Sequence, residues 1–369
     1  MWQLVLVLFV LQRFHSPALA GVSVVAGQVP GKVVSPLAGA LLDRYGRSYL
    51  VLVDYSLAAA LIGGIAWLAV AGLLSSGVLI GLLLLAGTTQ PLSQTGMRSI
   101  FPILIPRQLW DRANALDSST DVIATLIGPA LGGAGIGIAG AVAGVVAVAA
   151  VFAGAALVTF RLGDPTGAPV LGERLFSSAW RGLRYVVSHP TLRGLAVVVA
   201  LLNARVGVLL VAIPVLVQHQ FGGSASLTGL IFALYGVVGL VSGVVVGQHN
   251  SELRERSFIV AGSGLMGVGT LLLAVHGPLL LVLLGVSISG LGVGPANVSM
   301  FGLRQRRIPP EMLGRALAVS MALNGLGTPL GAALAGGLCA TGQTTIAFIV
   351  GGLMSLLAVG LTVPLIPFR

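Results

Sequence analysis

Charged residues are too scarce in this chain to coat a water-soluble surface. Only 8% of the 369 residues are charged and 56% are apolar, whereas a soluble domain carries about 25% charged residues. Apolar runs of about 20 residues, the length of a membrane-crossing helix, recur along the chain. The composition therefore all but excludes a soluble enzyme and predicts an all-α integral membrane protein.

Other classes fit the composition poorly. An outer-membrane barrel is not expected, because aromatic residues make up 6% of the chain and no ten-residue alternation is visible. The net charge of +10 is not arranged as a basic stripe interleaved with aromatics, so we expect no nucleic acid partner. The single Cys339 allows no disulfide within the chain. We expect no cofactor and no metal.

Apolar runs between charged, Pro or Gly residues predict twelve membrane helices. The first run has about 11 residues and would rise roughly 16 Å, half of a 30 Å hydrocarbon core. We therefore expect that the chain as given lacks the first half of this helix; a re-entrant or interfacial segment is the alternative. The predicted ranges are 2–12, 18–42, 49–72, 78–105, 113–137, 141–160, 194–218, 227–247, 258–275, 279–303, 315–340 and 345–367.

The cations predict the orientation. Most of the 20 Lys and Arg residues fall near the loops that follow the even-numbered helices, including Arg304, Arg306 and Arg315, whereas the opposite loops hold only Arg13. Cytoplasmic loops carry an excess of Lys and Arg. The even-to-odd loops and the C-terminus are therefore expected in the cytoplasm.

The longest connection divides the predicted helices six and six. Within it, apolar and polar residues of 175–187 fall on opposite helical faces, which predicts an amphipathic helix at the cytoplasmic interface. We expect an N-terminal six-helix bundle at 1–161, a cytoplasmic linker at 162–193 and a C-terminal six-helix bundle at 194–369. Similar Gly-rich segments in the two halves indicate parallel repeats, as in rocker-type secondary transporters.

The loop after the second predicted helix contains a recognisable motif. The segment 39–48 reads GALLDRYGRS and resembles the G-x-L-a-D-R-x-G-R motif of the major facilitator superfamily. Its matching residues are Gly39, Asp43, Arg44, Gly46 and Arg47. Independently of the resemblance, a glycine permits close helix packing, a carboxylate suits a helix N-terminus and arginines suit the anionic inner leaflet.

Further segments, 112–116, 128–133 and 182–190, are similar to the enterobactin-exporter-like efflux branch of that superfamily. The resemblance covers nearly the whole chain except its start. It implies two six-helix bundles related by a pseudo-twofold axis in a bacterial cytoplasmic membrane. It also implies a monomer that moves a small-molecule substrate by alternating access, with protons as the coupling ion.

Two motif roles follow from the resemblance. The loop motif would brace the second helix against the eleventh when the cytoplasmic side is closed; a plain topogenic loop is the alternative. Residues Gly128, Pro129, Gly132 and Gly133 resemble the antiporter motif of the fifth helix, in which a proline bends the helix and glycines admit a helix of the other half. Generic small-residue packing is the alternative here.

The chain also departs from the superfamily pattern. Ala124 stands where the fuller antiporter motif has a further glycine, and no arginine lies near the segment 88–91 of the fourth helix, where many members carry one. In the loop after the eighth helix, Gly247 and Gln248 replace the Asp-Arg pair of the first motif. These departures weaken the expectation of proton coupling.

Three ionisable residues inside predicted helices are candidate substrate or coupling residues, because such residues are costly in a membrane. Lys32 and Arg205 lie roughly 16 and 18 Å deep, one in each half. We expect both to line the central cavity; the alternatives are snorkelling for Lys32 and a structural role near a helix break for Arg205. Asp121 lies deeper than Asp54 or Asp117 and is the candidate coupling acid.

These observations predict a secondary transporter that exports a small molecule in exchange for protons. An importer or facilitator of the same fold is one alternative. A non-transporting scaffold or sensor is another, and it predicts that Lys32, Arg205 and Asp121 tolerate alanine together. The segment 290–294, GLGVG, has no preceding strand, so we interpret it as helix packing rather than a nucleotide site. No clustered nucleophile, base or metal ligands suggest an enzyme.

Overall fold

The computed structural model describes residues 1–104, 106, 109–161, 183–248, 254–275, 277–309 and 319–366. Every regular element in these ranges is a helix, which confirms the predicted all-α class. The elements are α1 (Trp2–Phe14), α2 (Pro17–Tyr45), α3 (Arg47–Val70), α4 (Ser76–Leu104), α5 (Trp110–Arg161), α7 (Pro190–Gln220), α8 (Ala225–Gly247), α9 (Glu255–Leu272), α10 (Leu279–Leu291), α11 (Val293–Arg307), α13 (Gly327–Ala340) and α14 (Thr344–Leu365).

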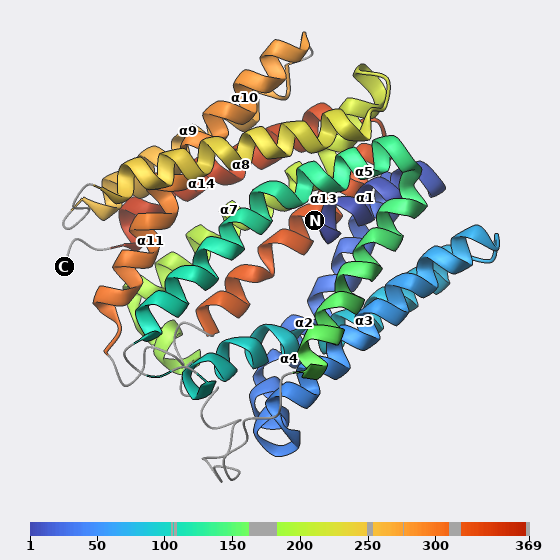
Figure 1. The fold of residues 1–369 in the computed structure, drawn as a ribbon. Helices are drawn as coiled ribbons and strands as arrows, with labels where there is room; N and C mark the ends of the chain where they lie inside the picture. The colour runs from blue at the N-terminus through green and yellow to red at the C-terminus, as the bar shows by residue number, and fades with distance from the viewer. Residues whose placement is uncertain are drawn as a thin grey trace.

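Eight helical spans in the described residues are long and apolar enough to cross a membrane, and α1 is a shorter apolar helix. The helices form two groups, α1 to α5 and α7 to α14 (Figure 1). In the first group α4 packs against α2 and α3, and α5 packs against α3; in the second, α7 packs against α13 and α14. The groups meet where α2 contacts α13 and α5 contacts α8.

The fifth and sixth helices, predicted at 113–137 and 141–160, are the two arms of α5, which turns sharply between them at Gly140, where φ is 86° (Figure 1). Two further predicted helices have a different form in the structure. The tenth is divided into α10 and α11 at Gly292, whose carbonyl lies against Gly262 of α9. In the eleventh, residues 319–325 are helical and a turn at 326 precedes α13.

Local sequence sets the helix boundaries. Ser16 caps α2, because its Oγ accepts a hydrogen bond from the backbone N–H of Leu19 at 3.1 Å, and Pro17 occupies the first turn. Ser224 caps α8 in the same way. Gly46 alone separates α2 from α3, with φ 96° and ψ 135°, a conformation that favours glycine.

The glycines of 290–294 pack against neighbouring helices, as interpreted from the sequence. A Cβ on Gly290 would lie 2.8 Å from the Tyr235 carbonyl oxygen of α8, and one on Gly294 would meet the backbone of α8 at Gly243. Such close approaches are typical of helices packed in lipid, where small residues allow backbones to touch. This segment therefore serves helix packing in the second group.

The linker lies largely outside the described residues, and with it most of the predicted amphipathic helix. Residues 183–188 are helical. In this part Val186 is buried and packs in one apolar cluster with Leu192 and Ile308, whereas Val187 is exposed. The predicted position of the whole linker helix at the membrane interface remains a prediction.

Two glycines of α13 allow a matched test of this packing. A Cβ on Gly331 would overlap the backbone of Ala204 in α7, whereas one on Gly337 has no neighbour within 4 Å. We predict that Gly331→Ala lowers the free energy of unfolding by about 1–3 kcal/mol through overpacking. Gly337→Ala should leave it unchanged or raise it by up to ~1 kcal/mol through helix propensity.

Thermal unfolding of both variants in the same detergent measures the difference. Equal melting temperatures for the two variants would contradict the close α7–α13 packing.

Candidate functional site

The first contact between the two helix groups joins the beginning of α2 to the end of α13. A Cβ on Gly21 would meet the carbonyl oxygen of Ala332, and one on Gly336 would lie 2.7 Å from the carbonyl oxygen of Pro17. Both positions lie near the connections that follow the odd-numbered predicted helices. The α2–α13 contact is therefore backbone to backbone at this end of the molecule.

The second contact joins α5 to the beginning of α8 at the same end. A Cβ on Gly133 would lie 2.6 Å from both the Ala225 carbonyl oxygen and the Gly229 Cα. One turn further on, a Cβ on Gly137 would lie 3.3 Å from the Cβ of Ser226. The small residues of α5 thus allow the two bundles to touch just before the turn at Gly140.

The four residues of the predicted antiporter motif divide between two neighbours. Gly133 faces α8, and the Pro129 carbonyl oxygen lies 2.9 Å from where a Cβ on Gly229 would stand. Gly128 and Gly132 instead face Met1 of α1. The expected contact with a helix of the other half is therefore present at Gly133 and Pro129, while the other two glycines pack within their own bundle. Within α5, non-helical dihedral angles occur at Gly140 rather than at Pro129.

Lys32 reaches across the boundary between the two groups. It is half-buried on α2, and its Nζ lies 3.1 Å from the position of a Cβ on Gly325, which precedes α13. Gly325 has no side chain to exclude the lysine, so the ammonium group lies next to the backbone of the other bundle. The expectation that Lys32 lines a central cavity stays a prediction.

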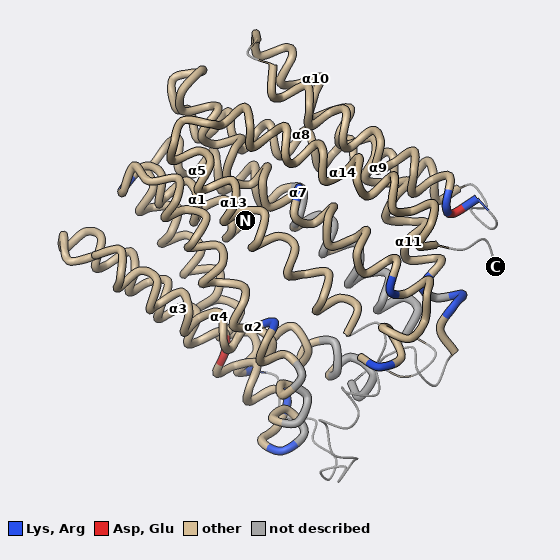
Figure 2. The backbone as a smooth tube through the Cα atoms, turned by 180° about the vertical axis from the view of Figure 1, so that it is seen from behind, with Lys and Arg blue, Asp and Glu red and all other residues tan. Residues whose placement is uncertain are grey.

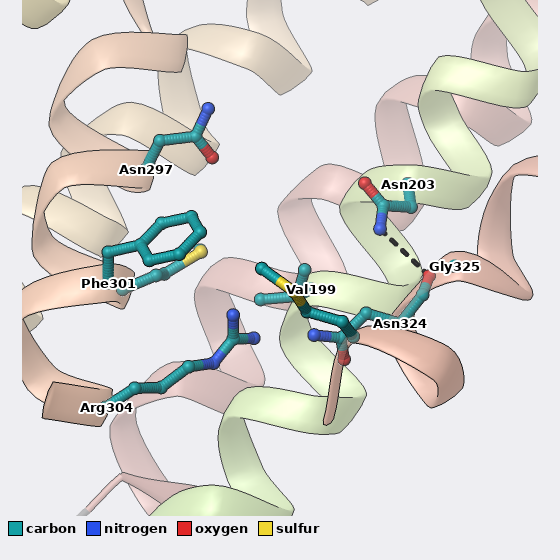
Figure 3. Close-up of a pocket in the computed structure, with 9 residues that line it drawn as sticks. Val199, Asn203, Asn297, Phe301, Arg304, Asn324 and Gly325 are labelled. Carbon is teal, nitrogen blue, oxygen red and sulfur yellow. Dashed lines mark hydrogen bonds between the residues drawn. The ribbon is translucent and has the colours of Figure 1, made fainter. Parts of the chain in front are cut away.

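A cavity of about 210 Å³ adjoins this point in the second bundle. Its polar lining comes from α7, α11 and the segment before α13, and its apolar lining includes two methionines (Figure 3). Asn203 donates a hydrogen bond from Nδ2 to the carbonyl oxygen of Asn324 at 2.9 Å. The lining residues are Val199, Asn203, Asn297, Met300, Phe301, Arg304, Met321, Asn324 and Gly325.

Arg304 is the cation of this cavity. Its side chain projects from α11 toward α7 (Figure 3) and is only 3% exposed, with its guanidinium carbon 5.9 Å from the centre of the Phe301 ring. The expectation that Arg304 is a topogenic loop cation is therefore wrong: α11 extends to Arg307 and carries Arg304 into the bundle. In the sequence, the only signal for this position is that the predicted helix 279–303 ends one residue before Arg304.

Arg205 does not line this cavity. It is 0% exposed and lies among α7, α8, α9 and α10. Its Nη1 donates to the Oγ1 of Thr270 at 3.1 Å and to the Oγ of Ser289, and its Nη2 donates to the Tyr235 hydroxyl at 2.7 Å. Within the described ranges its partners are neutral hydroxyls, neither a carboxylate nor the carbonyls of a helix break. Arg205 and Lys32 thus occupy separate places rather than one cavity.

The loop motif is described in part. Gly46 makes the tight junction between α2 and α3, and the Arg44 guanidinium carbon lies 5.3 Å from the centre of the exposed Tyr45 ring. Arg47 is the first residue of α3. The surroundings of Gly39 and the side chain of Asp43 lie outside the described part. Arg315, at the end of the loop before the eleventh predicted helix, also lies outside it. The role of this loop as a brace therefore remains a prediction.

The acids are also described in part. Asp121 is helical in α5, but its side chain lies outside the described part. Asp54 is buried on α3 and interacts with the side chains of Thr89 and Ser93 of α4. It therefore faces the stretch of α4 where many superfamily members carry an arginine. Among the described residues, His, Cys, Asp and Glu side chains form no group of three or more that could hold a metal ion.

Most of the described Lys and Arg residues gather at one end of the helices (Figure 2). This is the end of α2 that carries Arg44 and the end of α11 that carries Arg306 and Arg307. It is opposite to the end at which the two bundles touch. The three-dimensional placement thus agrees with the loop pattern seen in the sequence.

Comparison with known proteins decides the family. The family model described as Major Facilitator Superfamily matches residues 1–248 and 195–368. The chain belongs to the major facilitator superfamily. It is 37% identical over 369 residues to y4rN, an uncharacterized MFS-type transporter of Sinorhizobium fredii (strain NBRC 101917 / NGR234), an alignment that covers 100% of this chain and 91% of the relative.

Efflux proteins of this superfamily are also similar to the chain. The multidrug efflux pump Tap of Mycolicibacterium fortuitum is 27% identical, with 89% of this chain and 82% of Tap covered. The enterobactin exporter EntS of Citrobacter koseri (strain ATCC BAA-895 / CDC 4225-83 / SGSC4696) is 28% identical, with 88% and 77% covered. The predicted resemblance to the enterobactin-exporter-like branch is therefore confirmed at modest identity.

The fold comparison agrees with the family. The crystal structure of the nucleoside transporter NupG superimposes with a TM-score of 0.78 at 11% identity, covering 100% of this chain and 95% of NupG. The chain thus has the superfamily fold of a multi-pass membrane protein, as predicted.

The Arg205 cluster gives a stability prediction. Lysine at this position keeps a buried charge but cannot reach hydroxyls on three helices with one ammonium group. We expect Arg205→Lys to lower the free energy of unfolding by roughly 1–3 kcal/mol, the cost of poorly satisfied buried polar groups. Arg205→Met, which removes the charge as well, should cost less.

Thermal unfolding in detergent compares the three proteins. An Arg205→Lys protein that melts at the wild-type temperature would show that the hydroxyl contacts contribute nothing.

Proposed function

We propose that this protein is a secondary active transporter that exports a small molecule across the cytoplasmic membrane by alternating access. The observation that carries the proposal is that, among the described residues, the close backbone contacts of the two bundles at Gly21, Gly336 and Gly133 lie at one end, and that a cavity lies beyond them toward the opposite, cationic end. The positive-inside rule assigns the cationic end to the cytoplasm. The structure then corresponds to a state that is closed outside and open inside.

The small residues at the contact support rocking of the bundles. Gly21, Gly133 and Gly336 meet backbone on the opposing helix, so little side-chain interdigitation must be undone when the bundles separate. Helix pairs in lipid gain no hydrophobic driving force from their contact. Such a contact can therefore open at a modest free-energy cost, while a different contact forms at the other end of the bundles.

Export is favoured over import by the relatives. Tap is named as a multidrug efflux pump and EntS as an enterobactin exporter, and the α5 segment at Gly128–Gly133 matches the antiporter motif in this chain. Uptake of substrate by cells that express the protein would instead support an importer. Cells that keep their phenotype when Lys32, Arg205 and Asp121 are replaced by alanine together would support a scaffold or sensor.

Proton exchange is the proposed energy source, with Asp121 as the coupling acid. Each proton that enters down a membrane potential releases about 2.3 kcal/mol per 100 mV. Asp54 is a buried carboxylate of the same bundle, and its neighbours Thr89 and Ser93 are uncharged. The two acids lie on α5 and α3 of the first bundle, whereas the described cavity belongs to the second.

A cysteine pair can test whether the closed end must open. We predict that Gly137→Cys with Ser226→Cys, in a Cys339→Ala background, forms a disulfide, because the Cβ separation of 3.3 Å is close to the disulfide range of about 3.5–4.5 Å. Efflux from intact cells should fall to the background rate after oxidation. It should recover when a reductant is added.

Each single cysteine variant is the control and should transport at the same rate before and after oxidation. Full activity of the cross-linked protein would contradict alternating access through this contact.

Proton coupling can be tested in proteoliposomes. We predict that an inward-directed pH gradient, acid outside relative to the cytoplasmic face, accelerates export at least tenfold over the same vesicles with an uncoupler. Asp121→Asn should abolish this acceleration while downhill exchange continues, since the neutral amide cannot carry the proton. The flux of a substrate found by efflux screening is the measurement.

Flux that is insensitive to both the gradient and the uncoupler would show that the protein is a facilitator.

A further inference from the structure

The cavity in the second bundle holds a cation, Arg304, that has no anionic partner among the described residues. Nε and Nη2 of Arg304 are buried and have no hydrogen-bond partner among the described residues. Oδ1 of Asn324, which is 4% exposed, is also without a partner there. Unpaired groups of this kind are rare in buried sites, and here an arginine and an amide line the same cavity.

The nearest described acid on an adjoining helix is already engaged elsewhere. Glu255 of α9 forms an ion pair with Arg306, in which Oε1 lies 2.9 Å from Nη2. Arg306 is a surface residue two positions beyond Arg304. Arg304 therefore does not use this carboxylate. Lys32 adds a second positive charge at the border of the cavity, beside Gly325.

A buried, unpaired guanidinium costs free energy that a ligand can recover. Removing a charged group from water is expensive unless it is paired and hydrogen-bonded. The planar fork of arginine donors fits two oxygen atoms of a carboxylate or phosphate. A bound oxyanion would accept hydrogen bonds from Nε and Nη2 together and balance the positive charge, whereas a neutral acceptor leaves the charge unpaired.

The rest of the lining suits the body of such a ligand. Val199, Met300, Met321 and the Phe301 ring form an apolar wall. Asn297 of α11 lies on the same side of the cavity as Phe301 and Arg304, and Asn203 of α7 adds an amide group on the opposite side (Figure 3). A volume of about 210 Å³ corresponds to roughly seven water molecules at ~30 Å³ each, enough for an acidic group on a small ring.

We propose that this cavity binds a small organic anion, with Arg304 as the principal oxyanion-binding residue and Lys32 as a second cation at its border. The inference rests on the proposed function, since it names the class of molecule that the transporter carries. A carboxylate and a phosphate monoester share the required chemistry. The test separates them with one probe of each kind.

Thermal unfolding of the purified full chain in detergent gives the first test. The probes are benzoate, phenyl phosphate and the neutral benzamide, each at ~10 mM, about tenfold above a millimolar Kd. We expect benzoate or phenyl phosphate to raise the melting temperature in proportion to the logarithm of concentration, while benzamide has no effect. The anion with the larger shift identifies the class.

Two variants on α11 form a matched pair. Arg304→Gln should abolish the shift caused by the anion, and Arg306→Gln, which removes the surface cation paired with Glu255, should keep it. Without any probe, Arg304→Gln should unfold at a temperature no lower than the wild type, because the variant removes a buried charge that lacks a partner. A residue with a purely structural role predicts the opposite.

The proposal is overturned if neither anion shifts the melting temperature, if benzamide acts as strongly as benzoate, or if Arg304→Gln responds like the wild type. A lower melting temperature of unliganded Arg304→Gln also overturns it. Failure of the proposed function looks different: anions bind in an Arg304-dependent manner, yet proteoliposomes show no flux of them. Flux of a neutral or cationic substrate that is unaffected by Arg304→Gln would overturn the anion assignment alone.

Discussion

Backbone contact through glycine is the constraint on which the structure depends. Each of the two contacts between the bundles has a glycine on at least one side, and in the α5–α8 contact Gly133 faces Gly229. Larger side chains at these positions would keep the helices apart, and in lipid no hydrophobic term would restore the contact. The same use of small residues inside the second bundle lets α7 approach α13 at Gly207 and Gly331.

The two buried arginines show how differently a cation can be accommodated in the same bundle. Arg205 is surrounded by Thr270, Ser289 and Tyr235, which satisfy its terminal nitrogens and tie four helices together. Arg304 lines a cavity, and both its Nε and its Nη2 lack a partner among the described residues, whereas in Arg205 only Nε does. The first arrangement suits a structural residue, whereas the second suits a group that waits for a ligand.

Much of the fold was predictable from the sequence, because the run length of apolar residues reports a membrane span and the position of arginines reports an end of the helix. The turn at Gly140 falls in the gap between the predicted helices 113–137 and 141–160, whereas the break at Gly292 was missed, since it lies within continuous apolar and glycine-rich sequence. The depth of Lys32 along its helix follows from helical rise, but its role in a cavity stays a prediction. Arg205 and Arg304 were assigned to the wrong surroundings, because depth does not specify which face of a helix meets a cavity.

The central claim is that the two bundles rock against each other, so that one end closes as the other opens. Distances between spin labels in lipid bilayers test it most directly, with one pair at Tyr49 and Gly247 on the cationic end and another at Val70 and Leu280 on the opposite end. The account predicts two distances for each pair, with the open fraction at one end equal to the closed fraction at the other. A single unchanging distance at both ends, or ends that open together, would contradict it.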